Sequence, residues 1–255
     1  AFLTAFLVGS LPVGARLVER MSGWAPREVN PHLLGVENVA RLVGGGVALG
    51  AFGLDLVKGI VGLTAGVAGG WLAASLAVAG GVAPLPGFAP GGLLGAAAAA
   101  QGLVAALASA GLLGVVVGHL APLPLPGIAV APRGRGNAVV LGGLAGLYAF
   151  GVAPLWLVAV PVVAWAAVLA WTGYVALATV WGTIGFGLAG LVGGWTGAVA
   201  WEVPFAAALT AAAVGWRHKA SLSRIRDGTE PRLGDPAPVR GMDGSALAAF
   251  MIHPL

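Results

Sequence analysis

Two arginines separated by one glycine give this sequence its clearest potential for chemistry. The run Arg133-Gly134-Arg135-Gly136 combines guanidinium groups, whose forked N–H donors suit phosphate oxygens, with glycines that let backbone N–H groups turn toward the same anion. A phosphate-binding loop is therefore one interpretation. The other is a tight turn that only carries arginines at a membrane surface.

A carboxylate and an ammonium lie three residues apart inside an apolar segment, at Asp55 and Lys58. This spacing places both on one face of a helix, where they can form an ion pair. Ionisable residues within such segments usually face the protein interior and serve a function. The alternatives are a neutralised structural pair, or a Lys58 side chain that extends to the membrane surface.

A histidine among cations follows the last apolar segment. His218 comes directly after Arg217, with Ser221 and Arg224 close behind. Imidazole is the side chain best suited to exchange a proton near neutral pH, so His218 is a candidate base within an anion-binding cluster. The run 217–232 could instead anchor the chain to lipid headgroups.

The distribution of charge decides the class of protein that holds these residues. Residues 59–132 contain no Asp, Glu, Lys or Arg, and residues 136–216 contain only Glu202. The chain has 58% hydrophobic and 9% charged residues, against about 25% charged in ordinary soluble proteins. A water-facing surface of this size needs more charge, so most of the chain lies in a bilayer. The apolar runs are continuous rather than alternating, which favours helices over a β-barrel.

The remaining composition narrows the possible partners. The net charge is +4, but the basic residues stand between apolar runs. The positive-inside rule explains that placement, so we expect no nucleic acid partner. The sequence has no cysteine, which excludes disulfides and thiolate metal sites. Its four histidines show no metal-ligand spacing, so we expect neither a metal nor another cofactor.

The apolar runs predict an all-α fold, a polytopic integral membrane bundle of about seven transmembrane helices. We expect one helix over 1–18, a second within 42–81, a third over 93–117 and four within 138–216. The stretch 42–81 would be about 60 Å long as a single helix, which exceeds the thickness of a bilayer.

Glycine and proline mark the expected breaks in these runs. The long second run should break near Gly69-Gly70, or else tilt strongly, and the last block should break near Pro154, near Gly173 and around Glu202. The three basic segments 16–41, 133–135 and 217–232 are then separated by even numbers of crossings. They share one face, the cytoplasmic one, with the N-terminus outside and the C-terminus in the cytoplasm.

The order of short motifs resembles a known family. The motifs are, in chain order, Gly9-Ser10-Leu11-Pro12-Val13-Gly14, then Gly35, Asn38 and Arg41, then Asp55, Lys58 and Gly59, then Gly118-His119, Pro122 and Gly134-Arg135-Gly136, and finally Arg217-His218, Arg224 and Gly228-Thr229-Glu230-Pro231. In this order they are similar to the bacterial acyl-phosphate:glycerol-3-phosphate acyltransferases of the PlsY type. The resemblance spans residues 1–234, which we take as a membrane-embedded acyltransferase domain. Residues 235–255 would be a flexible tail or the start of a soluble domain that the chain does not include.

Several positions depart from the family's pattern. Pro31, Leu33 and Glu37 replace a serine, an asparagine and a threonine, and Ser221 replaces an asparagine. Arg135 stands where the family has lysine, and the run from Gly173 to Thr179 lacks an arginine and carries Ala176 in place of a serine. The chain thus resembles a divergent member.

The resemblance implies a reaction and a set of site residues. The enzyme would transfer a fatty acyl group from acyl phosphate to the 1-hydroxyl of glycerol 3-phosphate in the bacterial cytoplasmic membrane, forming lysophosphatidate for phospholipid synthesis. Its partners would be these two substrates and membrane lipids, with the oligomeric state left open. The implied catalytic residues are His218 and Arg135. The implied phosphate-binding residues are Asn38, Arg41, Lys58, Arg133, Arg135, Arg217, Ser221 and Arg224, and the supporting residues are Asp55, Gly35, Gly134, Gly136, His119 and Glu230.

Two other functions stay open at this point. One is a paralogue with impaired catalysis that binds lipid or phosphate, which the departures at Pro31, Leu33 and Ala176 motivate. The other is a small anion transporter that uses Asp55 and Lys58 as its intramembrane site. A transporter predicts internal repeats, and the sequence shows none of convincing similarity.

Overall fold

The computed structural model describes residues 1–23, 39–40, 43–80, 93–123 and 134–235, without the side chains of 22 and 93–99. This part of the chain is helical and contains no strand. The helices are α1 (Phe2–Ser10), α2 (Val13–Ser22), α4 (Gly45–Ala79), α5 (Leu93–Leu120), α6 (Asn137–Ala149), α7 (Leu155–Thr172), α8 (Val175–Trp195), α9 (Glu202–Arg217) and α10 (Lys219–Arg226).

Five stretches of the described chain are long and apolar enough to cross a membrane. They are Phe2–Met21, Gly45–Ala79, Ala100–Leu120, Leu155–Thr172 and Val175–Trp195. Helices α6 and α9 are apolar but shorter, at 13 and 16 residues. The predicted all-α membrane bundle is confirmed, while the number of crossings and their orientation stay predictions.

The first expected helix is two helices. The break falls at Leu11-Pro12, where Leu11 adopts an extended conformation with φ −68° and ψ 128°. A proline disfavours helical geometry in the residue before it and brings no N–H of its own. The prediction of one helix over 1–18 is wrong at this point, and the break leaves the Leu11 carbonyl free of the helical hydrogen-bond ladder.

Helix α4 runs without interruption for 35 residues, so of the two alternatives predicted for this run the break near Gly69-Gly70 is wrong, and the strong tilt stays a prediction. The glycines on its inner face allow close packing instead. A Cβ atom at Gly66 would collide with the Leu107 carbonyl, and one at Gly70 would lie 2.6 Å from the Val104 Cα. Small residues let helices approach closely in lipid, and here they hold α4 against α5.

The four helices predicted within 138–216 are confirmed as α6, α7, α8 and α9. Helix α6 ends before Pro154, and α7 ends at Gly173, which adopts a left-handed conformation with φ 75°. Helix α9 begins at Glu202 with Pro204 in its first turn, where the missing N–H costs no hydrogen bond. In this block the prolines and glycines predicted the helix boundaries correctly.

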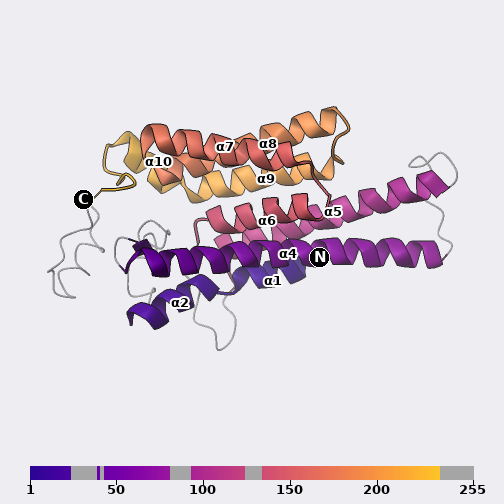
Figure 1. Cartoon of the computed structure of the whole chain (residues 1–255), viewed down its shortest axis with the longest axis horizontal. Coiled ribbons are helices and arrows are strands. Elements are labelled where there is room, and N and C mark those ends of the chain that lie inside the picture. Colours follow the sequence, from indigo (N-terminus) through magenta and orange to yellow (C-terminus); the bar gives the residue numbers. More distant parts are fainter. Residues whose placement is uncertain (24–38, 41–42, 81–92, 124–133, 236–255) are drawn as a thin grey trace.

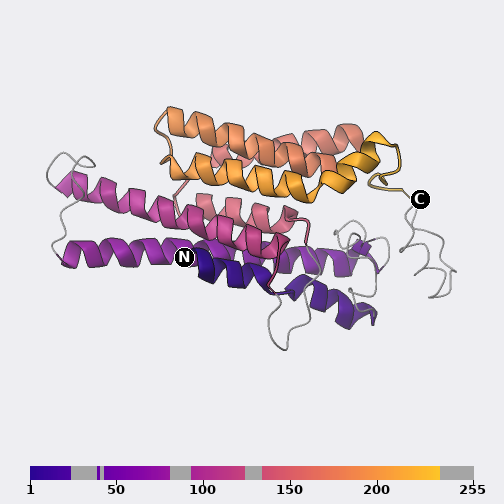
Figure 2. The same cartoon turned by 180° about the vertical axis from the view of Figure 1, so that it is seen from behind.

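The helices form two packed groups (Figures 1 and 2). One contains α1, α2, α4, α5 and α6, and the other contains α7, α8, α9 and α10, with α5 in contact with α9 between them. The hairpin of α4 and α5 extends beyond the other helices at one end. At the opposite end, on the left in Figure 1, lie α2, the start of α4 and α10.

Candidate active site

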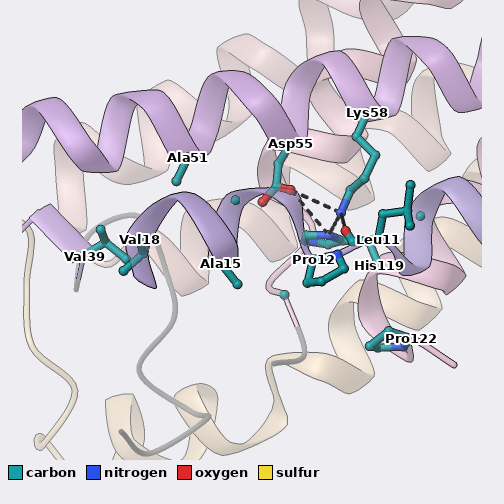
Figure 3. A pocket seen from close by; sticks show the side chains of 13 residues that line it. Leu11, Pro12, Ala15, Val18, Val39, Ala51, Asp55, Lys58, His119 and Pro122 are labelled. Atoms are coloured by element: carbon teal, nitrogen blue, oxygen red, sulfur yellow. Dashed lines mark hydrogen bonds and ion pairs between the residues drawn. The ribbon is translucent and has the colours of Figure 1, made fainter. Parts of the chain in front are cut away.

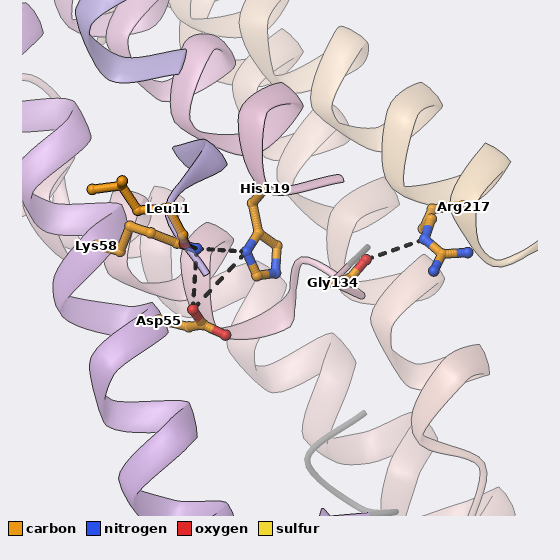
Figure 4. A network of polar contacts seen from close by, with 6 residues as sticks. All are labelled: Leu11, Asp55, Lys58, His119, Gly134 and Arg217. Carbon is orange, nitrogen blue, oxygen red and sulfur yellow. Dashed lines mark hydrogen bonds and ion pairs between the residues drawn. The ribbon is translucent and has the colours of Figure 1, made fainter. Parts of the chain in front are cut away.

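A buried lysine on α4 joins three segments of the chain. Lys58 Nζ lies 3.2 Å from Asp55 Oδ1, 3.0 Å from the Leu11 carbonyl oxygen and 2.9 Å from His119 Nδ1 (Figure 4). Only 6% of Lys58 is exposed. The three donors of its ammonium thus all have acceptors within the protein, and a phosphate would have to displace one of them to bind Lys58.

Gly134 is held between α5 and α9. Its N–H donates to the His119 carbonyl at 3.2 Å, and its own carbonyl accepts from Arg217 Nε at 3.1 Å (Figure 4). A side chain at Gly134 would overlap the His119 ring. The expectation that both loop glycines turn N–H groups toward an anion is therefore wrong for Gly134, whose N–H is used to fix the loop in place.

We expect Gly134→Ala to disrupt the clamp that His119 and Arg217 form on Gly134 through these two hydrogen bonds. The added methyl group occupies the position of the His119 ring, so either the ring or the loop must move. Overpacking of this kind typically costs about 1–3 kcal/mol. Thermal unfolding of the purified variant measures the loss, and Gly102→Ala, whose Cβ would meet nothing within 4 Å, serves as the control on α5. Equal melting temperatures for the two variants would contradict the clamp.

The loop leads directly into the N-terminus of α6. Gly136 is the N-cap and adopts φ 93°, a conformation that favours glycine. The first N–H groups of a helix lack intrahelical partners and carry partial positive charge, which suits an anion. Arg135 lies between the fixed Gly134 and this helix start, and the Oδ1 atom of Asn137 is buried without a partner among the described residues.

His218 lies in the turn between α9 and α10 and is 2% exposed. Its Nδ1 lies 2.9 Å from the Val214 carbonyl oxygen. Because a carbonyl oxygen can only accept, the proton is on Nδ1 and the lone pair is on Nε2. Nε2 is buried and has no hydrogen-bond partner within the described residues. The unprotonated nitrogen of the ring is therefore Nε2.

The charge state of His218 follows from its surroundings. Burial lowers its pKa to about 4, and the positive charges of Arg135 and Arg217 act in the same direction. The hydrogen bond to Val214 and the charge of Glu230 oppose this shift. The hydrogen bond from Arg217 Nε to the Gly134 carbonyl joins the loop and the end of α9 in one site.

Protonation of His218 should destabilise the protein. Between pH 6.5 and about 4 the unfolded chain binds this proton and the folded chain does not, so stability falls as pH falls through this window. The complete loss is about 3 kcal/mol. Unfolding followed from pH 7 to pH 4 should show it, and His218→Gln should flatten this part of the profile. An equally steep profile in the variant would assign the loss to other groups.

A second ion pair lies in the turn that follows α10. Arg224 Nε lies 2.6 Å from Glu230 Oε2, and another guanidinium nitrogen of Arg224 donates to Ser221 Oγ at 3.0 Å. The Arg224 carbonyl accepts from the N–H groups of Thr229 and Glu230. Arg224, which the resemblance implies as a phosphate ligand, is thus neutralised by Glu230 and holds the turn after α10.

A small cavity adjoins the Lys58 cluster. It encloses about 60 Å³ between the break after α1, helix α4 and the end of α5. Asp55, Lys58 and His119 form its polar wall, while Ala15 and Ala51 are among the apolar residues that line it (Figure 3). The cavity thus has a charged and an apolar side, as a site for an amphiphilic ligand requires.

The predicted site residues fall into three sets. His119, Gly134, Gly136, Arg135, Arg217 and His218 come together around the start of α6, with Asp55 and Lys58 beyond His119. Ser221, Arg224 and Glu230 form the neighbouring turn. Gly35, Asn38, Arg41 and Arg133 lie outside the described residues, as do the departures at Pro31, Leu33 and Glu37.

Sequence reasoning missed the role of the Leu11 carbonyl. The available signal was Pro12, because a proline disfavours helical geometry in the residue before it, so the carbonyl of that residue does not join the helical hydrogen bonds. No group of three or more potential metal ligands occurs among the described residues.

Comparison of the chain with known proteins identifies its family. The family model of glycerol-3-phosphate acyltransferase matches residues 1–228. The chain belongs to this acyltransferase family. The match includes the helices that carry Asp55, Lys58 and His119, the loop at Gly134 and the cluster around His218. No curated protein matches the chain.

Two crystal structures of PlsY (YgiH), an integral membrane glycerol 3-phosphate acyltransferase, share the fold. The glycerol 3-phosphate form is 23% identical with a TM-score of 0.60, covering 91% of this chain and 94% of that one. The lysophosphatidic acid form is 22% identical with a TM-score of 0.58, covering 91% and 93%. The predicted family and the membrane setting are thereby confirmed.

Proposed function

We propose that this acyltransferase moves a fatty acyl group from acyl phosphate to the 1-hydroxyl of glycerol 3-phosphate, in the bacterial cytoplasmic membrane. The products are lysophosphatidate and inorganic phosphate. The observation that carries the proposal is the contact of Arg217, the neighbour of His218, with the carbonyl of Gly134, the residue directly before Arg135 at the start of α6. The names of the PlsY structures, which are a glycerol 3-phosphate form and a lysophosphatidic acid form, support the same acceptor and product.

The charges of the site suit this reaction. Both substrates carry phosphate, so the site needs permanent cations at one place. Arg135 and Arg217 supply them, and Lys58 and Arg224 lie in the surrounding clusters with their charges paired. Guanidinium groups bind phosphate through charge-assisted hydrogen bonds, and the start of α6 adds the positive end of a helix.

The reaction needs no nucleophile from the protein. The glycerol 1-oxygen attacks the acyl carbonyl carbon, a new C–O bond forms, and the bond from that carbon to the phosphate oxygen breaks. Phosphate leaves with the electron pair. Arg135 stabilises the charge of the leaving phosphate, and positioning of two bound substrates supplies much of the remaining rate.

Two groups can accept the proton of the hydroxyl. One is His218 Nε2, which has a free lone pair among the described residues. The other is a phosphate oxygen of the substrate itself. With a pKa of about 4, His218 is unprotonated at neutral pH, so it is in the form that a base requires.

A paralogue with impaired catalysis is the second candidate. Ala176 replaces a serine in the motif that the sequence resembles, and it is 2% exposed in the first turn of α8. Alanine has no hydroxyl, so the hydrogen bond that a serine could donate at that position is lost. Such a protein would still bind phosphate at Arg135 and Arg217.

Turnover by the purified full chain in lipid nanodiscs tests the proposal. The assay supplies acyl phosphate and radiolabelled glycerol 3-phosphate and measures lysophosphatidate and inorganic phosphate, which should appear in equal amounts. Acyl-CoA serves as an alternative donor in a parallel reaction. Absence of product together with retained binding of phosphate, followed by ³¹P NMR, would support the paralogue and refute the enzyme.

A further inference from the structure

The contacts of Lys58 determine which nitrogen of His119 carries a proton. Lys58 Nζ lies 3.0 Å from Leu11 O, 3.2 Å from Asp55 Oδ1 and 2.9 Å from His119 Nδ1. An ammonium group has three N–H donors and no lone pair. Nδ1 must therefore accept, and the ring proton of His119 is on Nε2.

Asp55 acts on this arrangement through Lys58. Its Oδ1 lies 4.0 Å from His119 Nδ1, which is too far for a hydrogen bond, but 3.2 Å from Lys58 Nζ. The carboxylate thus favours the charged form of Lys58, which has only donors to offer. A protonated His119 would place two donors and two positive charges 2.9 Å apart, so the ring is neutral.

The Nε2–H group of His119 is directed at the loop before α6. The position of a Cβ on Gly134 would overlap Nε2, which shows how closely the ring approaches this residue. On the other side of Gly134, Arg217 donates to its carbonyl at 3.1 Å (Figure 4). His119 and Arg217 thus contact the same loop residue, and Arg135 is the next residue along the chain.

We propose that His119 Nε2–H donates a hydrogen bond to a phosphoryl oxygen bound at the loop of Gly134 to Gly136, and that Lys58 and Asp55 are positioning residues that fix this tautomer. The identity of the ligand rests on the proposed function, whereas the tautomer follows from the contacts of Lys58. His119 lines the cavity beside the loop, so a ligand there can reach it. A neutral imidazole adds a directed donor without adding another charge.

Nitrogen NMR of the full chain in nanodiscs tests the tautomer directly. With ¹⁵N-labelled histidine, His119 should show an unprotonated Nδ1 and a protonated Nε2 at neutral pH, assigned by the loss of its signals in His119→Gln. In Lys58→Met, His119 Nδ1 no longer has the Lys58 ammonium as a hydrogen-bond donor. The His119 ring should then change to a mixture of tautomers. The control Val57→Met alters the neighbouring exposed residue and should leave the signals unchanged. A proton on Nδ1 in the unaltered chain would overturn the proposal.

Two substitutions at His119 test which of the two ring nitrogens donates to the phosphate. A glutamine amide nitrogen can occupy the position of Nε2 and keep the donor, whereas an asparagine amide nitrogen corresponds to Nδ1. We expect His119→Gln to bind inorganic phosphate, measured by ³¹P NMR, within about threefold of the unaltered chain. His119→Asn should bind it about 10- to 100-fold more weakly, as loss of a hydrogen bond to a charged group implies.

The outcomes distinguish this inference from the proposed enzyme. Equal phosphate affinity for His119→Gln and His119→Asn would refute the donor role even if acyl transfer is observed. The predicted tautomer and the predicted difference between the variants would stand even if acyl phosphate were not the donor substrate. Thermal unfolding of each variant identifies any that fails to fold, and the tautomer of the unaltered chain then decides the question.

Discussion

Arg135→Ala should reduce kcat/KM for acyl transfer by about 100- to 1000-fold, the range found when one preorganised donor to a transition state is removed. Arg135 stands between the fixed Gly134 and the N-cap of α6, and its charge acts on His218. Its side chain lies in a loop and is not part of the apolar core, so the fold should persist. Steady-state kinetics together with thermal unfolding separate these two effects.

Two further variants sharpen this test. Arg135→Lys keeps the charge but loses the planar fork, so it should fall between the unaltered chain and Arg135→Ala. Arg226→Ala removes an exposed arginine at the same end of the molecule, where 81% of its side chain is accessible, and should leave kcat/KM within about twofold because exposed ion pairs contribute little. Unchanged turnover in Arg135→Ala would remove the phosphate site from the mechanism.

Gly59→Val should destabilise the membrane domain more than any substitution discussed above. A Cβ atom at Gly59 would collide with the Val139 carbonyl, and one at Gly142 would collide with the Leu56 carbonyl, so α4 and α6 meet backbone to backbone. The obstacle is main chain and cannot rotate away. Separating the helices forfeits their packing, and we expect a loss of about 3 kcal/mol or more.

Unfolding in a denaturing detergent measures this loss. Gly53→Val is the matched control because it adds the same side chain to the same helix, where a Cβ meets nothing within 4 Å. Gly59 is also adjacent to Lys58, so a displaced α4 should shift the His119 nitrogen signals as well. Equal stability of the two variants would show that α4 and α6 can separate at little cost.

The composition of the chain was sufficient to predict its class, and its prolines and glycines predicted the helix boundaries of the last apolar block. Charge-free runs require lipid around them, and Pro154, Gly173 and Glu202 correctly marked the divisions of the last block. The same reasoning failed at Gly69-Gly70, because a glycine can end a helix or let another helix approach, and only the neighbouring helix α5 decides between these. It failed again at Pro12, where the continuous apolar run 1–18 predicted one helix and the chain forms two, α1 and α2.

The site was predictable in part. Spacing alone paired Asp55 with Lys58. The predicted crossings placed the segments of Arg135 and His218 at one end, and the contact of Arg217 with Gly134 agrees with that placement, while the number of crossings stays a prediction. The contacts of Lys58 with Leu11 and His119 could not be predicted in this way, because they depend on how α1 and α5 approach α4. The role of Lys58 therefore changed from an expected phosphate ligand to a residue whose donors are used within the protein.

The length of α4 has a consequence for how the proposed donor arrives. The helix rises about 52 Å, whereas the hydrocarbon is about 30 Å thick and tilts rarely exceed about 40°, so one end must stand in the headgroup layer. From Lys58 to Ala79 it rises about 32 Å, which matches the thickness of the hydrocarbon, so a membrane span that ends at Ala79 would begin at Lys58, at the boundary with the headgroup layer. A donor with an acyl tail then arrives by lateral diffusion, and its mole fraction in the leaflet sets the velocity. Diluting the vesicles with inert lipid should slow the reaction even though the total amount of every reactant stays the same.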